Sequence, residues 1–114
     1  MADDAVYVDF KEGIKRVMNN TKLYVKLLAK FKTDAKVDDI IEGLAAGDYE
    51  KARVQAHTIK GIAANLSLME LYKQILELET QIKAKAVDFI QVEKVKTVYA
   101  ATVQEVDRVM AEHG

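Results

Sequence analysis

The chain of 114 residues contains no cysteine, no proline and no tryptophan. Without cysteine it can form neither a disulfide nor a thiolate metal site, and this composition fits a cytosolic protein. The lack of proline removes the residue that helix interiors tolerate least, which favours a helical fold. Half of the residues are apolar, and a chain of this length buries one core. We therefore expect a single domain over residues 1–114.

The chain also has no excess of charge of either sign. Its 17 basic and 18 acidic residues give a formal net charge of −1, so no overall field would attract nucleic acid or anionic lipid. No stretch approaches the roughly 18 apolar residues of a membrane span. Residues 1–5 are acidic and lack the features of a secretory signal, and residue 1 is a methionine. We expect a complete, cytoplasmic gene product that binds neither nucleic acid nor membrane.

The apolar residues recur at alternating spacings of three and four, which places them along one side of a helix. Three downstream stripes show this spacing: Tyr49, Ala52, Ala56, Ile59, Ala63 and Leu66; Leu68, Leu71, Ile75, Leu78 and Ile82; Val92, Val95, Tyr99, Thr102, Val106 and Val109. An upstream set reads as another helix: Leu23, Tyr24, Leu27, Leu28, Phe31, Val37, Ile40, Ile41 and Leu44. A polar interval at 32–34 divides this set, but it holds no glycine or proline, so continuity is favoured.

Glycines and capping residues mark the ends of these helices. Gly47 and Asp48 predict a tight corner, in which the Asp48 side chain accepts from the free amides of the next helix. Aspartates 9 and 88, each with Glu or Gln three residues later, are spaced as capping boxes. Short links favour antiparallel neighbours. We therefore predict an all-α, up-and-down four-helix bundle with helices at 21–46, 48–66, 68–84 and 88–112, preceded by a short N-terminal helix.

One of the two histidines, His57, has a distinctive environment. On a helix, Arg53, His57, Lys60, Gly61 and Ala64 project from one side, next to the apolar stripe, so the imidazole should be accessible to solvent. Gly61 costs roughly 0.8–1 kcal/mol of helix stability relative to Ala, and open access to the ring is a physical reason to keep it. The other histidine, at position 113, is expected to fray and has no assigned role.

This segment resembles the phosphoacceptor helix of histidine-containing phosphotransfer (HPt) domains, in which a histidine is followed after two residues by Lys-Gly and small residues. The order of helices before it, with Gly13, Phe31 and the corner at 47–48, is similar as well. Two residues depart from the family pattern, Ile62 after Lys-Gly and Ser67 at the helix end. The resemblance implies that His57 accepts a phosphoryl group.

The residue types around His57 suit that chemistry. A neutral ring nitrogen is abundant near neutral pH and can act as the nucleophile. Lys60 can stabilise the phosphoryl oxygens, Gly61 gives access to the imidazole, and Arg53 and Ala64 can contact a partner.

Glu79 is the less obvious candidate. It lies as far after the turn near position 68 as His57 lies before it, so antiparallel helices should bring the two together. A hydrogen bond would then orient the imidazole. The alternative is a surface ion pair between Glu79 and Lys83 at i+4.

We therefore expect a phosphorelay intermediate that accepts phosphate from one receiver domain and passes it to another. The resemblance implies receiver domains of response regulators and hybrid histidine kinases as partners, with Mg²⁺ bound on the receiver. The chain itself has no metal ligand set, no nucleotide-binding loop and hence no ATP-dependent kinase activity. A monomer is expected. The alternatives are an HPt-like adaptor that binds receivers without carrying phosphate, and a structural bundle that self-associates through its valine-rich last helix.

Overall fold

The computed structural model describes residues 6–114. Within this range it contains helices and no strand, so the all-α prediction is confirmed. The acidic residues 1–5, from which a secretory signal was judged absent, lie outside the described range. The helices are α1 (Phe10–Arg16), α2 (Thr21–Asp34), α3 (Val37–Ala45), α4 (Tyr49–Leu66), α5 (Met69–Lys83) and α6 (Phe89–His113). None of the helices described is long and apolar enough to cross a membrane.

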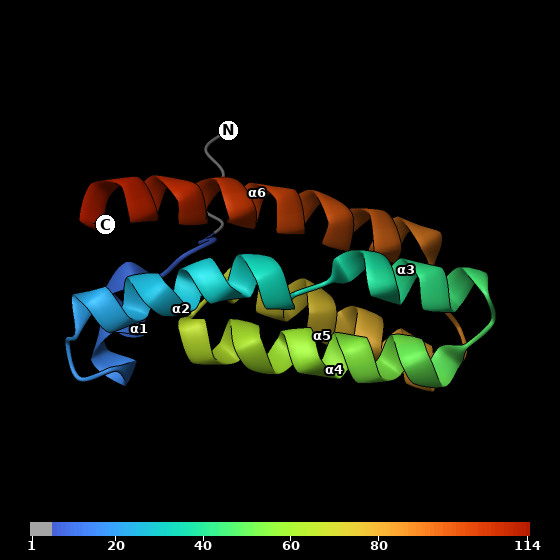
Figure 1. The fold of residues 1–114 in the computed structure, drawn as a ribbon. Helices are drawn as coiled ribbons and strands as arrows, with labels where there is room; N and C mark the ends of the chain where they lie inside the picture. Colours follow the sequence, from blue (N-terminus) through green and yellow to red (C-terminus); the bar gives the residue numbers. More distant parts are fainter. Residues whose placement is uncertain (1–5) are drawn as a thin grey trace.

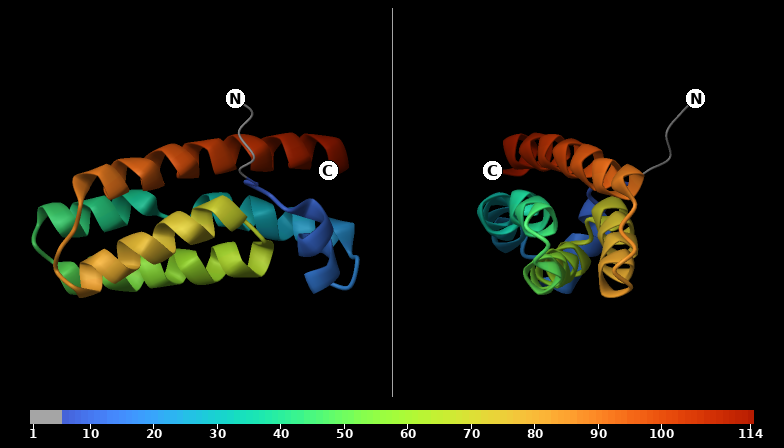
Figure 2. Two further views of the ribbon diagram at one scale, coloured as in Figure 1. Left: turned by 180° about the vertical axis from the view of Figure 1, so that it is seen from behind. Right: turned by 90° about the vertical axis from the view of Figure 1, so that its right-hand side faces the viewer.

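Helices α2 to α6 lie side by side along one long direction, and α1 lies across one end of them (Figure 1). α2 and α3 follow one another almost in line, and α6 runs along both of them. α4 and α5 are antiparallel neighbours, α3 packs on α4, and α5 packs on α6 (Figure 2). Among the described helices, α4 and α6 make no contact with each other.

The predicted continuous helix over 21–46 is wrong. α2 ends at Asp34 and α3 begins at Val37. Ala35, between them, has φ −87° and ψ 93°, an extended conformation that ends the helical hydrogen bonding. On α2, Lys32 of the polar interval pairs with Asp107 of α6, which holds the end of α2 against α6.

The reason for the break is a change in the phase of the apolar stripe. At roughly 100° per residue, a continuous helix would place Ile40 about 180° around the axis from Phe31. Asp38 would instead continue the buried stripe, since it lies a helical turn after Ala35. The break lets Phe31, Ala35 and Ile40 all reach the core. Burial of these residues overrides the lack of any glycine or proline at the break.

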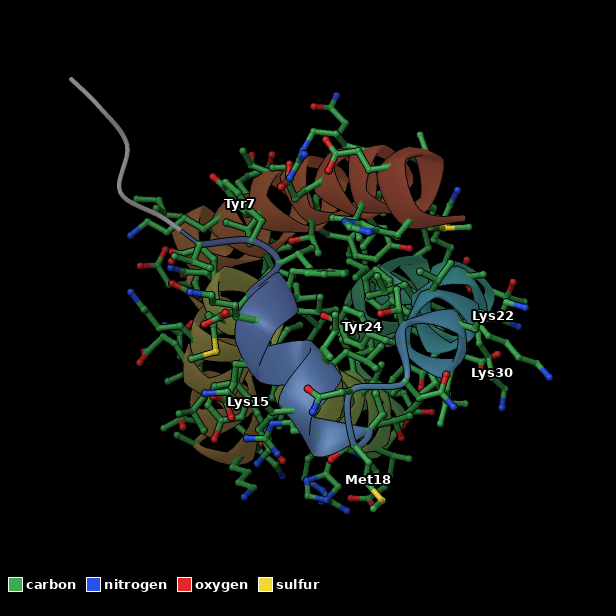
Figure 3. The ribbon with its side chains drawn as sticks, turned by 90° about the vertical axis from the view of Figure 1, so that its left-hand side faces the viewer. Tyr7, Lys15, Met18, Lys22, Tyr24 and Lys30 are labelled. Atoms are coloured by element: carbon green, nitrogen blue, oxygen red, sulfur yellow. The ribbon has the colours of Figure 1, made fainter. Side chains whose placement is uncertain are left out.

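The core contains the stripes predicted for the last three helices, with two exceptions: Tyr49 is exposed and Tyr99 is half-buried. Tyr24 lies in the interior between α1 and the other helices, whereas Met18 projects outward (Figure 3). The Tyr24 hydroxyl donates to the Leu66 carbonyl at 2.6 Å, which ties α2 to the end of α4. Burial, together with the charge of Asp9, raises the pKa of Tyr24 to about 12.

The aspartate caps form, but the capping boxes do not. Asp48 accepts from the amide of Lys51 at 3.0 Å, as predicted. Asp9 and Asp88 also accept from first-turn amides. Their own amides, however, donate to Ser67 O and Gln81 Oε1, and not to the Glu or Gln three residues later. These longer-range hydrogen bonds attach each helix start to a neighbouring helix or turn.

Ser67 ends α4 in the left-handed conformation, with φ 59° and ψ 40°. Glycine adopts this conformation at no steric cost, whereas a residue with a Cβ atom adopts it at a steric cost. Its amide is directed at the carbonyls of Ala63 and Ala64, and its carbonyl accepts from Asp9. The turn therefore keeps a geometry typical of a helix-ending glycine, and α5 returns antiparallel to α4.

Candidate functional site

α4 presents His57 at the edge of its buried face. Its neighbours Ala56 and Ile59 are fully buried, so the register of the helix is fixed by the core. His57 points away from that stripe, and its side chain is 65% exposed. The imidazole is thus accessible to solvent, as the sequence predicts.

Glu79 of α5 lies beside His57, and it is the centre of the cluster. Its side chain is only 2% exposed. The carboxylate oxygen Oε2 is 3.1 Å from His57 Nδ1, and Oε1 is 2.6 Å from Lys60 Nζ. Lys83 Nζ lies 3.8 Å from Oε2. Both interpretations of Glu79 are therefore realised at once, since it contacts the imidazole and also pairs with Lys83.

These neighbours keep Glu79 ionised. Burial alone would raise the pKa of its carboxyl group. The hydrogen bonds from Lys60 and His57, together with the positive charges of Lys60 and Lys83, outweigh burial and hold the pKa below its ordinary value. An ionised carboxylate only accepts hydrogen bonds. His57 Nδ1 must therefore carry the hydrogen and donate it to Glu79, which leaves Nε2 with its lone pair.

Two cations of the site already have anionic partners. The sequence assigns Lys60 to phosphoryl oxygens, but its ammonium pairs with Glu79 and its side chain is only 20% exposed. Arg53, one turn before His57, donates from Nε and Nη2 to the two carboxylate oxygens of Glu50, at 3.2 and 2.7 Å. Neither partner was predicted, because both depend on side-chain conformations that spacing along the sequence does not determine.

Gly61 has open space on its side-chain side. A Cβ atom built there would meet no heavy atom within 4 Å, other than those of its own helix and chain neighbours. This excludes the simple alternative that Gly61 lets another helix pack closely. Ala64, one turn further from His57, is half-buried. Ile62, which departs from the family pattern, packs against the core cluster on a different side of α4.

A groove adjoins the His57 cluster at the start of α4 and the end of α5. It has a volume of about 350 Å³. Its lining residues are Gly47, Asp48, Tyr49, Glu50, Arg53, Ile82, Lys83 and Lys85. From the sequence, Lys83 was expected only as the partner of Glu79 in a surface ion pair. Its position one helical turn after Glu79 was the sequence feature that could have identified it as part of this site.

The other histidine takes no part in the cluster. His113 belongs to α6, and its ring stacks on Phe10 with 4.1 Å between centroids. The expectation that it frays is therefore wrong, because the stacking contact holds the end of α6 against α1. Within residues 6–114, no group of three or more His, Cys, Asp or Glu side chains is placed to hold a metal ion.

Comparison with known proteins identifies the family of the chain. A family model described as the Hpt domain matches residues 26–111, a range that contains every residue of the His57 cluster. No curated protein and no solved structure matches the chain. Hpt domains have a phosphotransfer role in two-component signalling, as phosphocarriers and not as kinases. With three quarters of its length matched by this model, the chain belongs to the Hpt domain family.

Proposed function

We propose that this protein is a phosphorelay intermediate that carries a phosphoryl group on Nε2 of His57. The group comes from the aspartyl-phosphate of one receiver domain and passes to the aspartate of another, in hybrid histidine kinases and response regulators of the cytoplasm. The observation that carries the proposal is the pairing of an exposed imidazole with a buried, ionised carboxylate. Nδ1 is occupied by Glu79, no hydrogen bond of Nε2 is recorded among residues 6–114, and the side chain is 65% exposed.

The transfer step follows from this geometry. The Nε2 lone pair attacks the phosphorus of the aspartyl-phosphate, an N–P bond forms, and the P–O bond to the aspartate breaks. The aspartate leaves as a carboxylate with the bonding electron pair. Because Nδ1 keeps its hydrogen, the ring gains positive charge as the N–P bond forms, and Glu79 offsets that charge. Transfer to the second receiver is the reverse reaction.

The remaining site residues support the same step. Lys60 lies one turn from His57 and its flexible ammonium reaches phosphoryl oxygens as well as Glu79. Gly61 leaves the approach to the ring open. Mg²⁺ would be held by the receiver, where it neutralises the phosphoryl oxygens during transfer.

We propose that the fold is a four-helix bundle. In this bundle α2 and α3 together count as one of the four helices, and α1 is the additional N-terminal helix. α4 and α6 are then diagonal, in keeping with their lack of contact. The outer side of α4 would dock the receiver through Arg53 and Ala64 beside His57. We expect a monomer, so that this side stays open.

The test is phosphoryl transfer from a phosphorylated receiver domain. The wild-type chain should gain an acid-labile, base-stable label, and the His57→Gln variant should gain none while keeping its helix content. The His113→Gln variant is the matched control and should be labelled like the wild type. Binding of the receiver without any label on His57 would contradict the proposal and favour the adaptor alternative.

A further inference from the structure

The proposed function gives Lys60 two anionic partners. In the present structure its ammonium is 2.6 Å from Glu79 and is mostly buried against it. A phosphoryl group on His57, one turn away, carries more negative charge than a carboxylate and offers three acceptor oxygens. Once His57 is phosphorylated, Lys60 is shared between Glu79 and the phosphoryl group, or it leaves Glu79 for the phosphoryl group.

Loss of Lys60 as a partner would be costly for Glu79. Its side chain is almost fully buried, and Oε1 receives its hydrogen bond from Lys60. The hydrogen bond from His57 reaches the other oxygen, Oε2. A buried carboxylate with an unpaired oxygen is costly, and the cost is reduced by bringing in another cation.

Lys83 is the cation close enough to replace Lys60 as a partner of Glu79. Its ammonium is 3.8 Å from Glu79 Oε2, which is an ion pair but too long for a hydrogen bond. Its side chain is 58% exposed, and among the described residues Glu79 is the only ion-pair partner recorded for it. Glutamate four residues before lysine is the favoured order on a helix. A small change of its flexible side chain closes the distance to Oε2, so that the carboxylate keeps a cationic partner when Oε1 loses Lys60.

We infer that Lys83 is a positioning residue for phosphotransfer, which holds the Glu79 carboxylate in place when Lys60 turns to the phosphoryl group on His57. Lys83 does not itself touch the phosphoryl group. It acts through Glu79, and Glu79 in turn keeps the Nδ1 hydrogen and the plane of the imidazole fixed. The inference rests on the proposed function, because it concerns the phosphorylated state of the same site.

The chain offers a matched control in Lys85. It lines the same groove as Lys83 and is exposed, and no ion pair is recorded for it among the described residues. Lys83→Gln and Lys85→Gln therefore remove the same charge from the same groove, and only Lys83→Gln removes a contact with Glu79. Lys83→Arg restores the charge at the same place.

The experiment follows the Glu79 carboxyl by carbon NMR in the full chain, before and after phosphorylation of His57 with inorganic phosphoramidate. Before phosphorylation, Lys83→Gln should change the Glu79 carboxyl carbon shift at pH 8 little, because Lys60 still pairs with the carboxylate. After phosphorylation, also at pH 8, where the N–P bond is stable, the Glu79 shift of Lys83→Gln should differ from that of the wild type. Lys85→Gln and Lys83→Arg should follow the wild type.

The rate of transfer to a receiver domain gives the second readout. It should fall about two- to fivefold in Lys83→Gln, which is the range for one exposed ion pair, and should be recovered in Lys83→Arg. Equal behaviour of Lys83→Gln and Lys85→Gln, with normal phosphorylation of His57, would overturn this inference alone. Failure of wild-type His57 to take up phosphate would overturn the proposed function and this inference together.

Discussion

At the scale of single residues, the site depends on a carboxylate that water hardly reaches. Glu79 receives hydrogen bonds from His57 and Lys60, and it stays ionised because these donors and the charge of Lys83 outweigh its burial. The same contacts fix the hydrogen of His57 on Nδ1. One buried side chain on α5 thus determines which nitrogen of a ring on α4 is able to react.

Replacing Glu79 with Gln should lower the free energy of unfolding by about 1–3 kcal/mol at neutral pH, because Lys60 loses a charged acceptor in a partly buried place. The loss should depend on pH. The pKa of Glu79 is lowered on folding, so its contribution is fully present above the ordinary value of 4.5 and is lost as the pH falls through the lower folded value. Urea unfolding of both proteins at pH 7 and pH 3 measures this difference.

The matched control for this prediction is Glu77→Gln, two residues earlier on α5, where the carboxylate is exposed. It should change the unfolding free energy by less than about 0.5 kcal/mol at either pH. A stability difference between wild type and Glu79→Gln that is equal at pH 7 and pH 3 would show that Glu79 is not held ionised by its neighbours.

At the scale of helices, Gly13 and Gly61 both lie inside helices but have opposite surroundings. A Cβ at Gly13 in α1 would lie 2.4 Å from the ring atoms of Tyr24, so this glycine makes room for the core. A Cβ at Gly61 in α4 would meet no atom within 4 Å beyond its own helix and chain neighbours. Packing explains the first glycine but not the second, which we propose keeps the approach to His57 open.

Gly61→Gln should therefore raise the free energy of unfolding by about 0.5–1 kcal/mol, because glutamine is a good helix former and Gly61 is exposed. The same variant should slow phosphoryl transfer about tenfold, because the new side chain stands beside the imidazole and shifts the approach of the receiver. Thermal unfolding and a transfer assay on one preparation measure both effects. A variant that is more stable and equally fast would remove access as the reason for this glycine.

Gly13→Ala supplies the contrast on α1. It should destabilise the protein by about 1–3 kcal/mol, because the methyl group would displace the Tyr24 ring from its place in the core.

At the scale of the whole molecule, much of this architecture follows from spacing along the sequence. The stripes at 52–66, 68–82 and 92–109 predict which residues are buried, since the core needs one apolar side on each helix. The symmetric distances of His57 and Glu79 from the turn predict their contact. The break after Asp34 was missed because glycine and proline were taken as the signal, whereas the change of stripe phase between Phe31 and Ile40 was the deciding one.

The ion-pair partners of Lys60 and Arg53 could not be predicted from the sequence, for a different reason. Lys60 has Glu79 and the solvent within reach, and Arg53 has Glu50 one turn before it. Which of several nearby partners a long side chain takes depends on small energy differences among rotamers and on burial in the folded state. Spacing predicts that such residues meet, and the structure is needed to say which atoms do.

The most direct test of the account is the position of the phosphoryl group in the phosphorylated chain, observed by phosphorus and nitrogen NMR with the imidazole nitrogens labelled. We predict one N–P bond at Nε2 of His57, with the hydrogen of Nδ1 retained toward Glu79. A phosphoryl group on Nδ1, or on any residue other than His57, would contradict it.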